Sequence, residues 1–397
     1  MKRYYLTAAV VCLLALLAAS FVYDFWSPAP SLNIIRVGFL SENDEMTAST
    51  YNFEMSRNTL EKTFPGHIEV EIRQNIQAEE TEDVLEELVQ AGCSIIFTNT
   101  RSKVVRSFSE KYPDVQFCQL SGAVPAATDT DGNYHTFNAR YYEAHYIGGV
   151  VAGMKLREMI DSGIIQPEEA LVGYVGTFRN PEIVSGFTAF ILGVRSEAPE
   201  AVMRVRFTDT SSNFSREKNA AKRLIDEGCV IIAQNSGTSG PVSACQEASA
   251  DRPVYHVGFN ESFIDTGSMV TLVTPGTNWD PYMVNAVQAV RSHLDIEKFV
   301  SGSVHGNDIC AGFDQQWLEI IGLDGNLAAP GTAEKVQQVI SDIISGRLDI
   351  FRGDYIGVDL DNIRLRIDLN GGYTENSESS EPTFHYILRN VVTVEKE

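Results

Sequence analysis

The feature that most constrains the fold of this chain is an internal repeat. Residues 88–99, LVQAGCSIIFTN, correspond to residues 224–235, LIDEGCVIIAQN, with Gly92 aligned to Gly228. The strand-like segment RVGFL before the first copy has a counterpart, LVGYV, at nearly the same distance before the second. In both copies an amphipathic helical pattern ends in glycine and is followed by a short apolar run. In a chain of 397 residues, such a repeat predicts two copies of one architecture.

Each copy alternates strands with helices. The predicted strands are 34–40, 68–75, 93–99 and 115–120 in the first copy, and 170–176, 202–209, 230–235 and 254–260 in the second. Nearly all-apolar strands separated by amphipathic helices are typical of parallel sheets that are covered on both faces. The prediction is therefore an α/β fold of two doubly wound, Rossmann-like lobes joined by a hinge, with a β-rich C-terminal tail.

The predicted division of the chain follows the two copies. Segments after the second copy are expected to return and complete both sheets, with several crossovers between the lobes. The predicted boundaries are a signal peptide or anchor at 1–30, a first lobe at 31–160 completed by about 268–300, a second lobe at 161–267 completed by about 301–352, and a C-terminal extension at 353–397. We expect this extension either to contact a partner protein or to cover the edge of a sheet.

The N-terminal segment predicts export. Residues 6–22 carry no charge and follow Lys2 and Arg3. A run of this length is typical of a secretory signal, with cleavage near residues 18–20, or of an uncleaved membrane anchor. In either case we expect the rest of the chain to be extracytoplasmic, either membrane-associated or secreted.

Composition excludes several classes of function. The formal charge of −22 argues against a nucleic-acid partner, because phosphate binding requires a basic surface. Five cysteines follow Cys12, and none forms a CxxC pair or a Cys/His cluster with zinc spacing. We expect them to pack in the core, with a disulfide between some pair as the alternative. No metal site and no cofactor are predicted.

Polar and aromatic residues follow the predicted strands where a ligand would bind. In open parallel sheets, ligands bind beyond the carboxyl ends of the strands. Two such lobes facing each other predict a cleft lined by amides and hydroxyls interleaved with rings, a mixture suited to a flat polar ligand. The alternative is that the rings pack the hinge while Asn and Ser cap helices. The junction PGTNWDP, residues 275–281, belongs to this set.

Motifs of catalysis are missing from the sequence. It contains no GxSxG, HExxH or GxxxxGK[ST] pattern, and no GxGxxG after its first strand. We therefore expect a binding protein and not an enzyme.

Several long phrases resemble the basic membrane protein (BMP) family of extracytoplasmic solute-binding proteins. The resemblance covers about residues 34–351, and the phrases that carry it are ARYYEAHYIGGVVAGM (139–154), NPEIVSGFTAFILGVRSEAPEA (180–201), AAKRLIDEGCVIIAQNS (220–236), VYHVGFN (254–260) and TNWDPYMVNAVQAV (277–290). The resemblance implies the type I periplasmic-binding-protein fold and a monomer that delivers a purine nucleoside or purine base to an ABC permease.

Taken together, the strand-end positions and the resemblance predict a set of ligand-binding residues. They are Tyr51, Asn99, Phe178, Asn235, Ser239, Asn260, Asn278 and Trp279. The resemblance implies that Tyr51 and Phe178 stack on the base and that Trp279 closes the pocket. Asn260 stands where the family has an Asp, and an amide offers a ribose diol no charged acceptor. A free base or another small polar solute therefore remains open beside a nucleoside.

Two departures from the family leave a second function open. The N-terminal segment lacks the lipid-attachment cysteine found in many members, and the tail after residue 353 differs from the family pattern. The alternative to an importer component is therefore a membrane-tethered sensor that signals to a partner protein.

Overall fold

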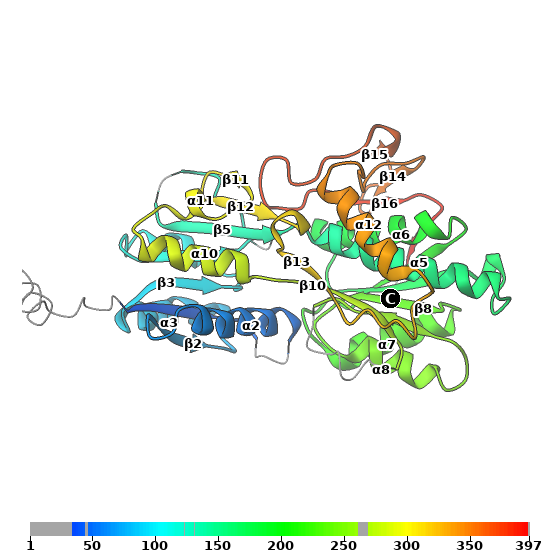
Figure 1. The fold of residues 1–397 in the computed structure, drawn as a ribbon, viewed down its shortest axis with the longest axis horizontal. Helices are drawn as coiled ribbons and strands as arrows, with labels where there is room; N and C mark the ends of the chain where they lie inside the picture. The colour runs from blue at the N-terminus through cyan, green and yellow to red at the C-terminus, as the bar shows by residue number, and fades with distance from the viewer. Residues whose placement is uncertain (1–33, 44–46, 123, 131, 261–268, 396–397) are drawn as a thin grey trace, which may run out of the picture.

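The computed structural model describes residues 34–395, apart from 44–46, 123, 131 and 261–268 (Figure 1). The predicted signal peptide or anchor at 1–30 lies outside the described residues. Among the helices that are described, none combines the length and apolar character needed to span a bilayer.

The first lobe is built on a seven-stranded sheet. Its order is β11-β12-β5-β4-β3-β1-β2. In that order the bounds are Ser303–His305, Asp308–Ala311, Tyr134–Ala139, Gln116–Leu120, Cys93–Thr98, Ile35–Leu40 and Ile68–Arg73. All neighbours pair in parallel except β11, which is antiparallel to β12. The interior strand β5 is absent from the strands predicted from the sequence, because its run YHTFNA mixes polar with apolar residues.

The second lobe repeats this topology. Its sheet has the order β13-β10-β9-β8-β6-β7-β17. In that order the bounds are Leu318–Ile321, Thr271–Thr277, Tyr255–Val257, Ile231–Asn235, Leu171–Gly176, Val202–Phe207 and Val392–Val394. The order β2-β1-β3-β4-β5 of the first lobe therefore corresponds to β7-β6-β8-β9-β10. This confirms the predicted α/β fold of two similar lobes.

Helices cover both sheets. Those of the first lobe are α2 (Ala48–Thr63), α3 (Thr81–Gln90), α4 (Val104–Ser109), α10 (Asp280–Arg291) and α11 (Ile296–Phe299). Those of the second lobe are α5 (Tyr141–Asp161), α6 (Pro181–Glu197), α7 (Phe214–Asp226), α8 (Gly240–Ala248) and α12 (Thr332–Ile344). Figure 1 shows α10 alongside the first sheet, although the strand β10 that leads into it belongs to the second sheet.

The repeated glycines have the same physical role in both lobes. Gly92 and Gly228 follow α3 and α7 with φ angles of 88° and 102°, a left-handed conformation that glycine adopts without strain. Gly38 and Gly173 lie in β1 and β6, which occupy equivalent positions in the two sheets. A Cβ on Gly173 would lie 2.7 Å from Ile232 Cδ1, and the equivalent contact at Gly38 would be 3.0 Å. Close packing of strand neighbours therefore excludes side chains at these positions.

Within the described residues, the chain passes from one sheet to the other three times, at places other than the predicted boundaries. It leaves the first lobe after β5, returns between β10 and α10, and leaves again between β12 and β13. Helix α5 therefore packs on α6 of the second lobe, although 31–160 was assigned to the first. Strand β10 belongs to the second sheet, because it pairs with β9. Strands β11 and β12 belong to the first sheet, because β12 pairs with β5 and β11 pairs with β12. Crossovers at strand ends join the sheets without breaking either one.

The C-terminal extension is β-rich, as expected, and covers an edge of the second sheet. Strands β14 (Ile356–Asp359), β15 (Arg366–Asp368) and β16 (Tyr386–Leu388) form a small antiparallel sheet. Thr188 Oγ1 on α6 donates a hydrogen bond to the Tyr386 carbonyl at 3.0 Å. Beyond this sheet, β17 pairs with β7. An otherwise open strand edge is thereby satisfied.

The same extension also reaches the first lobe. The backbone N–H and the hydroxyl of Ser380 donate to the two carboxylate oxygens of Asp308 on β12, each at 2.6 Å. Ser380 Oγ lies 2.5 Å from Ser121 Oγ, at the end of β4, and the Glu381 carboxylate accepts from the Ala126 N–H at 2.5 Å. The extension therefore connects the two lobes, as the red segment above them in Figure 1 shows.

Ser380→Ala tests this connection. Ser380 and Asp308 are fully buried, and removing a hydrogen bond to a buried charged acceptor costs about 1.5–3 kcal/mol. We expect urea unfolding to show a loss of free energy of unfolding in that range. Ser377→Ala is the control, because Ser377 is exposed and its loss is expected to change stability by less than about 0.5 kcal/mol. Equal effects in the two variants would contradict a stabilising role for this contact.

Candidate functional site

A cavity of about 200 Å³ lies between the carboxyl ends of the two sheets. Both lobes contribute to its walls. The first lobe supplies Asn99, Thr100, Arg101, Ser121 and Gly122, and the second supplies Phe178, Asn180, Glu182, Asn235, Ser236, Phe259 and Asn260. The walls combine amides, hydroxyls and rings, in the position where open α/β sheets bind ligands. We take this inter-lobe cavity as the candidate site.

Four of the eight residues predicted from the sequence line the inter-lobe cavity. They are Asn99, Phe178, Asn235 and Asn260. Three others, Tyr51, Asn278 and Trp279, line an adjacent cavity of about 320 Å³ between α2, the start of α10 and β13. Ser239 lines neither of these cavities and is the residue before α8.

Asn99 and Asn235 hold their places through long hydrogen bonds. Asn99 Oδ1 accepts from the Glu42 N–H at 3.3 Å, and its amide nitrogen lies 3.4 Å from Thr50 Oγ1. The Asn235 amide nitrogen lies 3.4 Å from His145 Nε2, and burial lowers the pKa of this imidazole to about 3. His145 is therefore neutral at physiological pH. Because bonds of this length are weak, both amides can exchange them for stronger bonds to a ligand.

Asn260 connects the lobes at the edge of the cavity. Its Oδ1 accepts hydrogen bonds from the Thr277 N–H at 2.9 Å, the Thr277 hydroxyl at 3.1 Å and the Asn52 amide on α2 at 2.9 Å. Its φ angle of 55° lies in the left-handed region, which Asn tolerates better than most residues. The side-chain carbonyl of Asn260 is therefore engaged by the crossover, and this Asn52–Asn260–Thr277 cluster lies between the two cavities.

Trp279 lies in an aromatic core, in agreement with the alternative that the rings pack the hinge. Only 2% of its surface is exposed. Its ring packs edge-on against Phe53, Phe137 and Trp317, at centroid distances of 6.2, 5.2 and 6.1 Å. The sequence signal, a ring at a strand end, does not distinguish a ligand contact from a hinge contact, because both occur at the same place in the chain.

Asn278 likewise builds the junction before α10. Its Oδ1 accepts from the Asp280 N–H and its amide donates to the Gln316 carbonyl, both at 3.1 Å. The first bond closes a side-chain turn that leads into the helix, and the second ties this crossover to the one that leads into β13. The PGTNWDP junction therefore joins two crossovers of the hinge.

Phe178 presents a half-buried ring to the inter-lobe cavity. The guanidinium of Arg101, from the opposite lobe, lies 5.2 Å from the centre of this ring, within cation–π range. Arg101 also pairs with Glu42 at 3.6 Å. Sequence reasoning missed Arg101, although it stands two residues after Asn99 at the same strand end.

Glu182 is a second residue that sequence reasoning missed. It lies in the first turn of α6 and is half-buried in the cavity wall. Burial raises the pKa of its carboxyl to about 7, and the nearby charge of Arg101 opposes this shift. Glu182 lies in the helix that follows β6 and not at the strand end, so the strand-end pattern does not include it.

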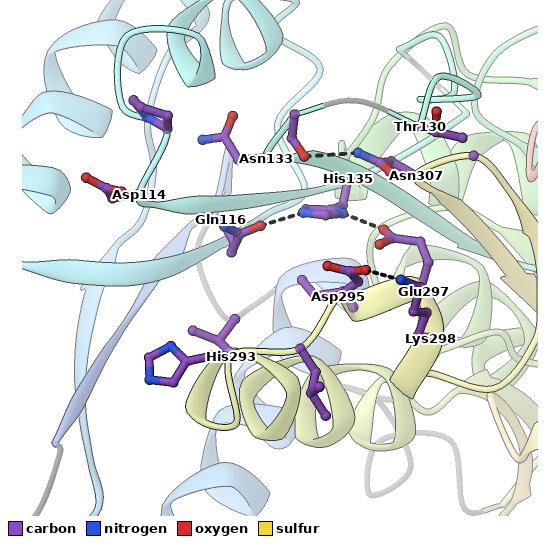
Figure 2. Close-up of a pocket in the computed structure, with 16 residues that line it drawn as sticks. Asp114, Gln116, Thr130, Asn133, His135, His293, Asp295, Glu297, Lys298 and Asn307 are labelled. Carbon is purple, nitrogen blue, oxygen red and sulfur yellow. Dashed lines mark hydrogen bonds and ion pairs between the residues drawn. The ribbon is translucent and has the colours of Figure 1, made fainter.

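A larger cavity, of about 620 Å³, lies elsewhere (Figure 2). It is at the amino ends of β4 and β5, away from the cleft. Figure 2 shows His135 between Gln116 and Glu297, and Lys298 paired with Asp295. His135 Nε2 lies 2.8 Å from Gln116 Oε1, and His135 Nδ1 lies 2.5 Å from Glu297 Oε1. These five groups are therefore paired with one another.

The cysteines belong to the core. Cys93, Cys118, Cys229, Cys245 and Cys310 are buried free thiols. Burial raises the pKa of the Cys93 thiol to about 11, so it is protonated and unreactive at neutral pH. Within the described ranges, no group of three or more His, Cys, Asp and Glu side chains is arranged to hold a metal ion.

Comparison with known proteins identifies a family. Residues 43–345 match the family described as PnrA-like ABC transporter substrate-binding proteins. A purine-binding protein of Brucella abortus is 27% identical over 244 residues, which are 61% of this chain and 64% of the relative. A relative from Haloferax volcanii, named as a glucose-binding protein of an ABC transporter, is 29% identical over 217 residues, 54% of this chain and 50% of the relative. The chain thus matches less than two thirds of the length of either relative.

Solved structures show the same fold. A solute-binding protein of an ABC transporter system from Aeropyrum pernix superposes with a TM-score of 0.64, at 14% identity, and covers 79% of this chain and 92% of its own. At this identity the likeness concerns the fold alone. It agrees with the type I periplasmic-binding-protein architecture implied by the resemblance.

Trp279→Ala separates packing from ligand contact. Loss of a fully buried Trp costs about 3–5 kcal/mol, so we expect a large fall in the free energy of unfolding, measured in urea. Phe178→Ala is the matched control, because this half-buried ring is expected to contribute less than about 1.5 kcal/mol. A Trp279 variant that unfolds like the unmodified protein would show that the ring is not part of the core.

Proposed function

This chain belongs to the family of PnrA-like ABC transporter substrate-binding proteins, and we propose that it binds a purine base or purine nucleoside between its two lobes. The observation that carries the proposal is the inter-lobe cavity, where the half-buried ring of Phe178 and the amide of Asn235 in one wall lie opposite the amide of Asn99 in the other. The purine-binding relative from Brucella abortus supports the choice of solute.

The chemistry of the cavity suits a flat heterocycle. An exposed aromatic face stacks on a planar ring, and each amide offers both donors and an acceptor to the edge of the ring. The cavity of about 200 Å³ is below the range of about 300–1,000 Å³ usual for ligand pockets. This size favours a compact base in the present arrangement of the lobes, and a nucleoside would require the lobes to separate further.

The proposed role is delivery and not catalysis. A solute that contacts both lobes stabilises the arrangement in which they lie close together, and that arrangement is recognised by an ABC permease. The protein acts outside the cytoplasm as a monomer, associated with the membrane through its N-terminal segment or released from it.

A ligand sensor is the second candidate function. The observation that favours it is the C-terminal extension, which lies beyond the family match and contacts both lobes. A segment that touches both lobes can transmit their relative movement to a partner protein. Co-purification from membranes decides between the two: an associated permease supports transport, and an associated signalling protein supports sensing.

Purine binding is measured on residues 34–397 by thermal unfolding against purine bases, nucleosides and glucose. A ligand at 100-fold excess over its Kd stabilises the folded protein by about 2.7 kcal/mol, a readily visible shift. We expect purines to produce this shift and glucose to produce none. Phe178→Ala should weaken purine binding by about five- to 150-fold, since stacking on an aromatic side chain contributes about 1–3 kcal/mol per base.

Phe214→Ala is the control for this measurement. Phe214 is an exposed ring of the same lobe and lies outside the inter-lobe cavity. Its replacement should leave the affinity for purines unchanged. A shift with glucose alone, or purine affinity that survives the loss of Phe178, would contradict the proposed site.

A further inference from the structure

We infer that Glu182 contacts the solute and selects ligands that present two adjacent hydrogen-bond donors. The inference rests on the proposed purine-binding function and specifies which purines the cavity prefers. Two parts of a purine ligand carry such a pair: the neighbouring N–H groups on the edge of guanine, and the diol of ribose.

The backbone around Glu182 fixes its position in the cavity. Asn180 caps α6 by accepting a hydrogen bond from the Ile183 N–H at 3.0 Å, and Pro181 occupies the first helical position. On the opposite lobe, a Cβ on Gly122 would lie only 2.9 Å from Glu182 Oε2. The carboxyl of the second lobe therefore reaches the backbone of the first, and any solute bound between the lobes passes close to it.

Among the described residues, nothing donates a hydrogen bond to the carboxyl of Glu182. Its nearest counter-charge is Arg101. Arg101 is itself engaged by Glu42, at 3.6 Å, and by the ring of Phe178. A partly buried carboxylate without hydrogen bonds is unfavourable, so a solute that supplies donors is bound at this point.

A carboxylate discriminates between purines by hydrogen-bond chemistry. When ionised it only accepts, and its two oxygens match two parallel N–H donors or two hydroxyls. The edge of guanine offers two such donors, whereas the edge of adenine places a ring acceptor beside its amino group. Where the base edge faces it, an ionised Glu182 therefore favours guanine and disfavours adenine, because the adenine acceptor would face a negative charge. Where the ribose faces it, the diol supplies the paired donors whichever base is attached.

The preference should depend on pH. The groups that face Glu182 are Arg101, Tyr141 on α5 and Tyr174 on β6. Burial raises the pKa of both phenols well above 10, so both tyrosines stay neutral at neutral pH. The carboxyl itself has a pKa of about 7. Its ionised fraction therefore rises as the pH rises through 7, and affinity for a paired donor should rise with it.

The test uses the full chain and three ligands that separate the two sources of donors. Dideoxyguanosine has the paired N–H edge and no diol, adenosine has the diol and no paired edge, and dideoxyadenosine has neither. Dissociation constants of the unmodified protein and of Glu182→Gln are measured by calorimetry at about pH 6 and about pH 8. The exposed Glu168→Gln is the control variant.

We expect Glu182→Gln to weaken one of the first two ligands at least about tenfold at high pH, because a hydrogen bond to a charged group is lost. Selective weakening of dideoxyguanosine assigns Glu182 to the base edge, and selective weakening of adenosine assigns it to the diol. In both cases the pH dependence should disappear in the variant, while its thermal unfolding stays cooperative.

Equal affinities in the variant and the unmodified protein, or an equal loss for all three ligands, would overturn the inference and leave purine binding intact. Absence of binding of every purine to the unmodified protein would instead remove the proposed function, and this inference with it.

Discussion

The arrangement of both lobes depends on the aromatic cluster where the chain crosses between them. Phe137 on β5 stacks on Tyr282 at 4.0 Å, and Trp317 packs edge-on against both Tyr282 and Trp279. These side chains come from three separate segments of the chain, all next to crossovers. Because large buried rings contribute several kcal/mol each, the cluster fixes how the crossovers meet. The strand ends of the two sheets consequently face one cavity.

Two sets of polar contacts connect the lobes in addition to this aromatic cluster. The Asn52–Asn260–Thr277 cluster joins α2 to the end of β10, and Ser380 joins the C-terminal extension to Asp308 on β12. When the lobes move relative to each other, these buried hydrogen bonds either break or are kept because both partners move together. These contacts therefore help to set the width of the cavity. The hydrogen bonds of Asn260 and the position of the extension both contribute to it.

Sequence patterns predicted the repeated architecture because they reflect local packing. A glycine that ends a helix in a left-handed conformation, such as Gly92 or Gly228, is recognisable from its place in an apolar pattern. The same reasoning brought Asn99 and Asn235 to equivalent strand ends, where the structure places both at one cavity. It missed β5, whose polar residues are satisfied by neighbours distant in sequence: Thr136, for example, donates to Asp308.

The sequence by itself determined the α/β class, the two similar lobes, the family and the edge of each sheet where polar residues gather, since these depend on periodicity and on residues close in the chain. Only the tertiary structure decided which of those residues face the cavity. Trp279 packs in the hinge, Asn260 turns to the crossover, and Glu182 enters from a helix. The reason is that a side chain at the hinge contacts residues of another crossover. The spacing of residues along one segment gives no information about the distance in space between two crossovers.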